Sequence, residues 1–140
     1  RIDVTRGLED TLLVHSHELG GIQLVRDYAP VPAILAFPAE LNQVWSNLVA
    51  NAVAAMKGHG RLTLQVGEAE GAVRVVVADS GPGIPPDHLA RIFERGFTTR
   101  SGGLGLGLSI SRSIVERHGG RIEVDSQPGH TEFRVWLPEV

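Results

Sequence analysis

The spacing of hydrophobic residues predicts two helices in the first part of the chain. Residues 6–19 form one amphipathic pattern, which ends at the glycine pair 20–21. The apolar residues of 39–57 recur at helical spacing and predict the strongest helix of the chain. The apolar side of the first helix is expected to hold Leu8, Leu12 and Leu19. That of the second is expected to hold Leu41, Val44, Trp45, Leu48, Val49, Ala52 and Met56.

Short alternating or apolar runs predict five strands, at residues 22–28, 62–66, 73–78, 121–125 and 132–137. Glu70 and Gly71 fall between the second and third runs and predict a hairpin turn. Residues 80–104 look irregular, with a short helix around 88–93. A further helix is expected over 105–117, where glycines open it and another glycine pair closes it.

Strands that follow one another in pairs favour a mixed or antiparallel sheet. We therefore expect an α+β fold, a two-layer sandwich of a mixed β-sheet with helices on one face. The strict strand–helix alternation of a dinucleotide-binding fold is absent. A chain of 140 residues fits one domain, and we expect 1–140 to be a single domain of a longer protein, because the chain starts with Arg1.

Composition narrows the function classes. The net charge of -3 gives no basic footprint for nucleic acid, so no such partner is expected. The chain has no cysteine, which excludes disulfides and thiolate zinc sites and fits a cytoplasmic location. No apolar run approaches the roughly 20 residues needed to span a bilayer, so we expect no membrane insertion by this chain, although its parent could be anchored.

Gly103, Gly105 and Gly107 alternate with leucines, and Leu108 follows them at the start of the predicted helix. Unpaired backbone N–H groups at a helix N-terminus favour phosphate, and glycines let that backbone approach it. A tight loop before a helix is the plain alternative. A dinucleotide site would need a strand directly before the glycines, and here a polar loop precedes them.

Asp79 ends an apolar strand and is followed by Gly81, Gly83 and Ile84. A carboxylate at this position can accept a hydrogen bond from an exocyclic amine such as that of adenine. The alternative is an ordinary turn, in which Asp and Gly are common.

Asn47 and Asn51 are four residues apart and so lie on one helix face, next to apolar positions. The neutral amide oxygen suits Mg²⁺, which keeps several waters and bridges phosphates. The alternative is a pair of structural amides that are satisfied internally.

Ile92 and Phe93 precede a polar stretch that contains Thr99 and Arg100. The apolar side chains could anchor a loop while Thr99 and Arg100 reach a phosphate. The alternative is a hydrophobic patch followed by a solvated basic residue.

These four elements, in this order, resemble the nucleotide-binding boxes of the histidine-kinase ATP-binding domain. That domain belongs to the GHKL superfamily, with DNA gyrase, the heat-shock chaperone and the mismatch-repair ATPases. The resemblance extends from about residue 8 to residue 138 and includes the segment 114–129. It implies a helical layer on a mixed sheet, with ATP and Mg²⁺ as ligands.

The resemblance also implies roles for single residues. Asn51 would coordinate Mg²⁺, Asn47 would lie close to the phosphates, and Arg100 would take the place of a phosphate-contacting lysine, so that Asn47 and Arg100 are the catalytic candidates. Asp79 would bind the adenine amino group, with support from Thr131. The remaining nucleotide contacts would come from Gly81, Gly83, Ile84, Thr99, Gly103, Gly105, Gly107 and Leu108.

The implied activity is transfer of the γ-phosphoryl group to a histidine of a separate dimerisation domain of the same protein, and from there to a response regulator. Asn47 stands where gyrase-type ATPases carry a glutamate base, which favours transfer over hydrolysis. His17 is not the acceptor, since a glycine pair follows it. Without that domain, the chain should be a monomer with little kinase activity of its own.

Two alternatives stay open at this point. One is a serine kinase of the anti-sigma-factor type, which needs no histidine hairpin. The other is a nucleotide-binding regulatory module without transfer activity, because Ala54 stands where these kinases usually have a polar residue.

Overall fold

The computed structural model describes residues 1–94 and 107–139. Five strands form one mixed sheet in the order β1-β2-β3-β5-β4. Strand β1 pairs with β2 in parallel, and the other neighbours are antiparallel. The strands are β1 (Ile22–Tyr28), β2 (Gly60–Ala69), β3 (Ala72–Asp79), β4 (Arg121–Gln127) and β5 (His130–Pro138).

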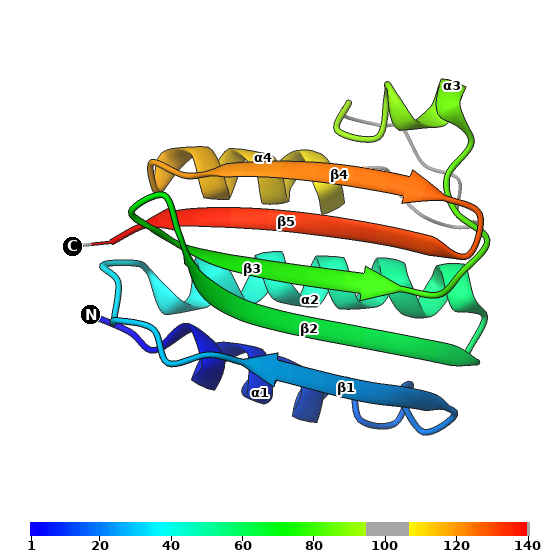
Figure 1. Cartoon of the computed structure of the whole chain (residues 1–140), viewed down its shortest axis with the longest axis horizontal. Coiled ribbons are helices and arrows are strands. Elements are labelled where there is room, and N and C mark those ends of the chain that lie inside the picture. The colour runs from blue at the N-terminus through cyan, green and yellow to red at the C-terminus, as the bar shows by residue number, and fades with distance from the viewer. Residues whose placement is uncertain (95–106, 140) are drawn as a thin grey trace.

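Three helices cover one face of this sheet, and they lie behind the strands in Figure 1. They are α1 (Val4–Val14), α2 (Pro38–Met56) and α4 (Gly107–Arg117), with α2 packed between the other two. The short helix α3 (Pro86–Leu89) lies apart from this layer. The fold is therefore the predicted α+β sandwich, with its helices on one face.

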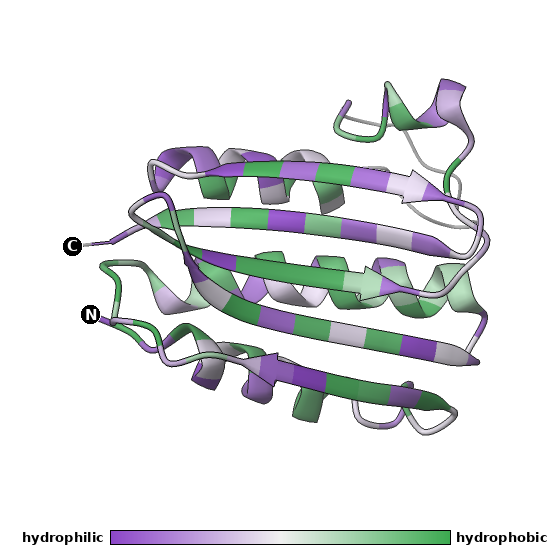
Figure 2. Cartoon of the chain, in the orientation of Figure 1, coloured by the Kyte–Doolittle hydropathy of each residue, from purple (hydrophilic) through white to green (hydrophobic). Residues whose placement is uncertain are grey.

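The hydropathy pattern explains which side of each strand meets the helices. Along β5 the buried residues alternate with more exposed ones, and β3, at the centre of the sheet, is apolar along most of its length (Figure 2). The helix-facing side of β5 is formed by Thr131, Phe133, Val135 and Leu137. This alternation places the core between the sheet and the helices.

Helix α2 is the central element of the helical layer. Pro38 occupies its first turn, where a missing N–H costs nothing, and Lys57 ends it in a left-handed conformation. All seven residues predicted for its apolar face are buried, with Trp45 only 1% exposed. This agreement follows from the 3.6-residue period, which places those seven side chains on the side that faces the sheet.

Two sequence predictions about helices need correction. Helix α1 ends at Val14, not at residue 19, and the following residues form turns. The turns are closed by backbone hydrogen bonds to the His15 carbonyl, and they still bury Leu19. The short helix starts at Pro86 and ends at Leu89, earlier than predicted, because the proline favours a helix N-terminus.

No helix in the described part of the chain is long and apolar enough to cross a membrane.

Candidate functional site

Most of the predicted site residues that the structure describes gather at one end of the molecule. Strand β3 ends there, β5 begins there, and the N-terminus of α4 and the C-terminal half of α2 face the same end (Figure 1). These four elements lie next to one another, since β3 pairs with β5 and α2 packs on both α4 and β3. Two groups of side chains meet at this end.

The first group, which we call the strand-end cluster, consists of Asp79, Gly81, Ile84, Ser126 and Thr131. Asp79 is the last residue of β3 and is only 6% exposed. Its Oδ1 accepts a hydrogen bond of 2.9 Å from the Gly81 N–H. Burial raises the pKa of the Asp79 carboxyl, while the Gly81 hydrogen bond and the nearby His130 act in the opposite direction. The carboxylate therefore keeps unused acceptor capacity in a poorly solvated position.

The hydroxyl groups of Thr131 and Ser126 complete the strand-end cluster next to Asp79. Thr131 lies directly opposite Asp79 in the register of β3 and β5 and is buried. The Thr131 and Ser126 hydroxyls are hydrogen-bonded at 2.7 Å, and the Ile84 N–H donates to Ser126 Oγ at 2.8 Å. Ser126 thus ties the glycine turn after β3 to the β4–β5 hairpin.

The glycines of this turn are required by close packing. A Cβ on Gly81 would lie 2.9 Å from Asp79 Oδ1 and 3.3 Å from the Ala55 side chain on α2. Gly83 has a φ of 92°. A Cβ on Gly83 would lie 2.6 Å from the Gln127 carbonyl oxygen. A larger residue at Gly83 would be strained by its backbone angle and would also clash with the β4–β5 hairpin.

The second group, which we call the helix-pair cluster, consists of Asn47, Gly107 and Ser111. The Asn47 amide nitrogen donates to the Gly107 carbonyl at 3.0 Å and to Ser111 Oγ at 3.1 Å. Asn47 therefore holds the first turn of α4 against α2. One turn further along α2, Asn51 is half-buried, and no described residue forms a hydrogen bond with its amide.

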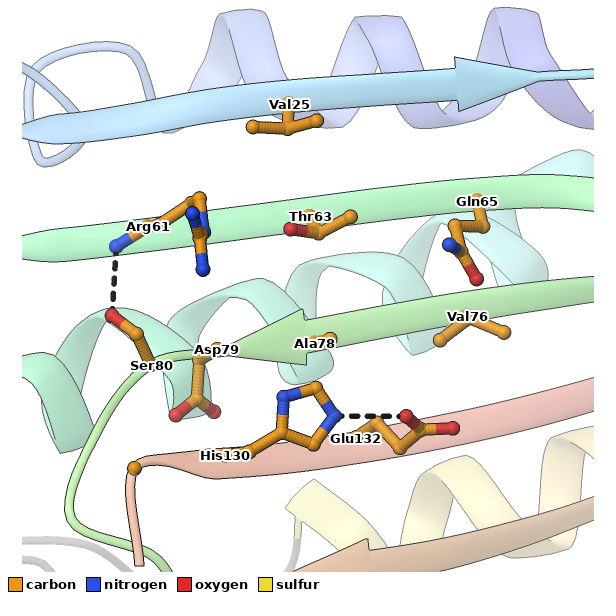
Figure 3. Close-up of a pocket in the computed structure, with 11 residues that line it drawn as sticks. Val25, Arg61, Thr63, Gln65, Val76, Ala78, Asp79, Ser80, His130 and Glu132 are labelled. Atoms are coloured by element: carbon orange, nitrogen blue, oxygen red, sulfur yellow. Dashed lines mark hydrogen bonds and ion pairs between the residues drawn. The ribbon is translucent and has the colours of Figure 1, made fainter.

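A shallow hollow of about 250 Å³ lies on the open face of the sheet, beside the strand-end cluster. Asp79 and His130 meet at its rim, and the His130 ring is bonded to Glu132 at 2.9 Å (Figure 3). The rest of its lining comes mainly from polar and small residues of β2 and β3. Asn47 and Gly107 do not line this hollow, because they belong to the helical layer on the other side.

A known protein family matches the part of the chain that contains α2, β3 and α4. The sequence profile described as histidine kinase-, DNA gyrase B-, and HSP90-like ATPase matches residues 37–140. The chain belongs to this family.

Relatives in this ATPase family include sensor kinases. The chain is 41% identical over 129 residues to the sensory histidine kinase/phosphatase NtrB of Escherichia coli O157:H7, an alignment that covers 84% of this chain and 37% of NtrB. The catalytic domain of the histidine kinase ThkA superposes with a TM-score of 0.90 at 29% identity, covering 99% of this chain and 93% of that domain. Full-length ShkA, solved in complex with AMPPNP, gives a TM-score of 0.87 at 34% identity over 98% of this chain and 30% of ShkA. The chain thus spans well under half the length of NtrB.

The structure brings together only some of the site residues that were predicted from the sequence. Asp79, Gly81, Ile84 and Thr131 share one cluster, and Asn47 and Gly107 share the other. Leu108 is half-buried against the core. Four of the named residues lie outside the described part of the chain, namely Thr99, Arg100, Gly103 and Gly105.

Two serines with clear roles in these clusters were missed by sequence reasoning. Ser126 lies on the same face of β4 as Ile122 and Val124, because the three are spaced two residues apart. This spacing already indicates a position facing the helices. Ser111 lies on the helix face of Ile114 and Val115 and is fully buried. In both cases the periodicity was a usable signal, because a polar residue in a buried register needs a partner.

Proposed function

We propose that the chain is the Mg-ATP-binding catalytic domain of a sensor histidine kinase. The observation that carries the proposal is the buried Asp79 carboxylate, which has one backbone N–H partner and remaining acceptor sites at the edge of the α2–α4 layer. A buried carboxylate favours an N–H donor and disfavours a carbonyl, so this position suits the amino group of adenine and opposes the oxo group of guanine.

The phosphates and Mg²⁺ would then lie toward α2 and α4. Asn47 and Asn51 supply neutral amide oxygens, and Mg²⁺ accepts such ligands together with water and phosphate oxygens. In the described part of the chain no group of His, Asp and Glu residues could hold a metal by itself, which fits a metal carried mainly by the nucleotide. The ion, when bound, would neutralise charge on the transferring phosphoryl group. The AMPPNP complex of ShkA supports a nucleotide role for this fold.

In the full-length protein we propose that this domain, spanning 1–140, supplies the γ-phosphoryl group to a histidine of a separate dimerisation domain, from which a response regulator is phosphorylated. NtrB and ThkA are both histidine kinases by name, and this favours a histidine acceptor over a serine acceptor. Asn47 is neutral and its amide nitrogen is occupied by α4, so it cannot act as a base for water. This chemistry supports transfer over hydrolysis.

Calorimetric titration tests the nucleotide part of the proposal. With Mg²⁺ and non-hydrolysable analogues, the chain should prefer adenine over guanine nucleotides by about 10- to 150-fold, the equivalent of about 1.5–3 kcal/mol for a hydrogen bond to a charged group. Asp79→Asn keeps the size of the side chain but can donate as well as accept, so it should reduce this preference. Equal affinity of the parent chain for both bases would contradict the proposal.

The transfer part is tested with a helical-hairpin domain that carries a phosphoacceptor histidine, added as a separate protein. With γ-labelled ATP, we expect acid-labile label on the hairpin only when the chain is present. Nucleotide binding without any transfer to a competent hairpin would favour a regulatory module over a kinase.

A further inference from the structure

The helix-pair cluster contains a closed triangle of hydrogen bonds. The Ser111 hydroxyl donates to the Gly107 carbonyl, four residues earlier on α4, at 2.8 Å. The Asn47 amide nitrogen reaches both of these groups from α2, at 3.0 Å to the carbonyl and 3.1 Å to the hydroxyl. Ser111 is 0% exposed, so no water competes for its hydroxyl.

The chemistry of the triangle fixes the orientation of the Asn47 amide. A carbonyl oxygen can only accept, and the single hydrogen of the Ser111 hydroxyl is already given to it. Both groups therefore offer lone pairs to Asn47, and the amide must turn its nitrogen toward α4. With the nitrogen held there, the amide oxygen Oδ1 takes the other position of the amide group. No described residue donates a hydrogen bond to Oδ1.

This orientation decides what Asn47 can contact in a bound nucleotide. Phosphate oxygens are acceptors, as Oδ1 is, so the two would repel each other. A magnesium ion, or a water molecule that it polarises, is the complementary partner for Oδ1. Asn47 would then act on the metal side of the nucleotide and would not donate directly to a phosphate.

We propose that Ser111 is a positioning residue, which together with the Gly107 carbonyl orients the Asn47 amide so that Oδ1 is offered to magnesium. The inference rests on the proposed function, since it needs a Mg-nucleotide at this end of the molecule. It adds a residue outside the predicted set, which acts through Asn47 and touches no ligand itself.

The test compares Ser111→Ala with a matched control on another helix. Thr11 is also buried, at 5% exposure, and its hydroxyl also donates to a carbonyl four residues earlier, Gly7, at 2.9 Å. No hydrogen bond joins Thr11 to Asn47 in the described part of the chain, so Thr11→Ala removes a similar bond without touching Asn47. Both variants lose a buried hydroxyl, and only one should change the metal dependence of binding.

The first readout is the nucleotide dissociation constant measured in EDTA divided by the one measured in Mg²⁺. We expect Ser111→Ala to lower this ratio by about two- to tenfold, the effect of one hydrogen bond, with little change in EDTA. Thr11→Ala should leave the ratio unchanged. A ratio that stays constant in Ser111→Ala, or affinities that fall equally with and without the metal, would overturn the inference.

The second readout needs no nucleotide. The side-chain NH₂ signals of Asn47, assigned by their loss in Asn47→Ala, should shift in the NMR spectrum of Ser111→Ala and stay in place in Thr11→Ala. Unmoved Asn47 signals in Ser111→Ala would refute the orienting role even if affinity changed. A parent chain that binds no nucleotide, in EDTA or in Mg²⁺, would instead remove the proposed function, and the magnesium role of Asn47 with it.

Discussion

The strand-end cluster and the helix-pair cluster are built in different ways, although they lie at the same end of the molecule. The first is anchored in the sheet, since Asp79 and Thr131 are paired strand residues and the Ile84 N–H donates to the hydroxyl of Ser126 on β4. The second is held by one side chain, because Asn47 reaches across from α2 to the first turn of α4. A cluster inside a sheet is fixed by the core, whereas a contact between two helices can change with a small shift of one of them.

This difference supports the separate tasks that we propose for the two clusters. The rigid strand-end cluster suits recognition of a flat base, for which the position of a single carboxylate matters. The helix-pair cluster suits a metal and phosphates, whose geometry changes during phosphoryl transfer. We therefore expect changes in the strand-end cluster to affect stability and base preference, and changes in the helix-pair cluster to affect the magnesium dependence of binding.

The largest effect on the strand-end cluster is expected from Gly83→Ala. The new Cβ would be strained by the φ of 92° and would lie 2.6 Å from the Gln127 carbonyl. Together these should lower the free energy of unfolding by about 3 kcal/mol, measured by urea denaturation. Gly129→Ala is the control, because Gly129 has a φ of 85° but no atom near its Cβ position. Equal losses in the two variants would mean that the contact with the hairpin is unimportant.

A smaller effect is expected from Ser126→Ala. The change leaves the Ile84 N–H and the Thr131 hydroxyl without their common partner. We expect a loss of about 1–3 kcal/mol in unfolding free energy, together with weaker binding of adenine nucleotides. Ser113→Ala, at an exposed position of α4, should change neither quantity. If Ser126→Ala were as stable as the parent, the hydroxyl link would not hold the turn.

Parts of the fold and of the two clusters could be predicted from the sequence, and other parts could not. The strand at 22–28, the hairpin at Glu70 and Gly71 and the apolar face of α2 follow from local periodicity, and the structure agrees with each. Asp79, Asn47 and Gly107 could be chosen because their motifs are local. The bonds from Ser126 to Ile84 and from Ser111 to Asn47 join residues far apart in the chain, so their partners could not be predicted from spacing.

The pH dependence of stability offers a weaker test of the strand-end cluster. Because the pKa of the Asp79 carboxyl is raised in the folded protein, the folded state holds its proton at pH values where the unfolded state has lost it. The contribution of Asp79 to stability should therefore increase as the pH falls through the window above the ordinary aspartate pKa. Nucleotide affinity should fall in the same window, because protonation removes the charge. Asp79→Asn should abolish both trends; trends that persist in the variant would assign them to another group.

The smallest effect is expected at the other end of α4. Arg117 contacts Glu40 on α2 at 3.2 Å, but both side chains are well exposed. Arg117→Ala should cost about 0.5 kcal/mol or less in urea denaturation, because solvent screens such pairs. It should leave the magnesium dependence of binding unchanged. A large change in that dependence would mean that α4 responds as a whole and that Asn47 is not its main link to α2.

The most direct test of the two-cluster account is a nucleotide titration of the parent chain, Asp79→Asn and Asn47→Ala, each in Mg²⁺ and in EDTA. We expect Asp79→Asn to weaken the binding of adenine nucleotides by a similar factor in both conditions. Asn47→Ala should weaken binding in Mg²⁺ much more than in EDTA. If Asn47→Ala lowered affinity equally in both, or if the loss in Asp79→Asn depended on the metal, the division between base and metal recognition would be contradicted.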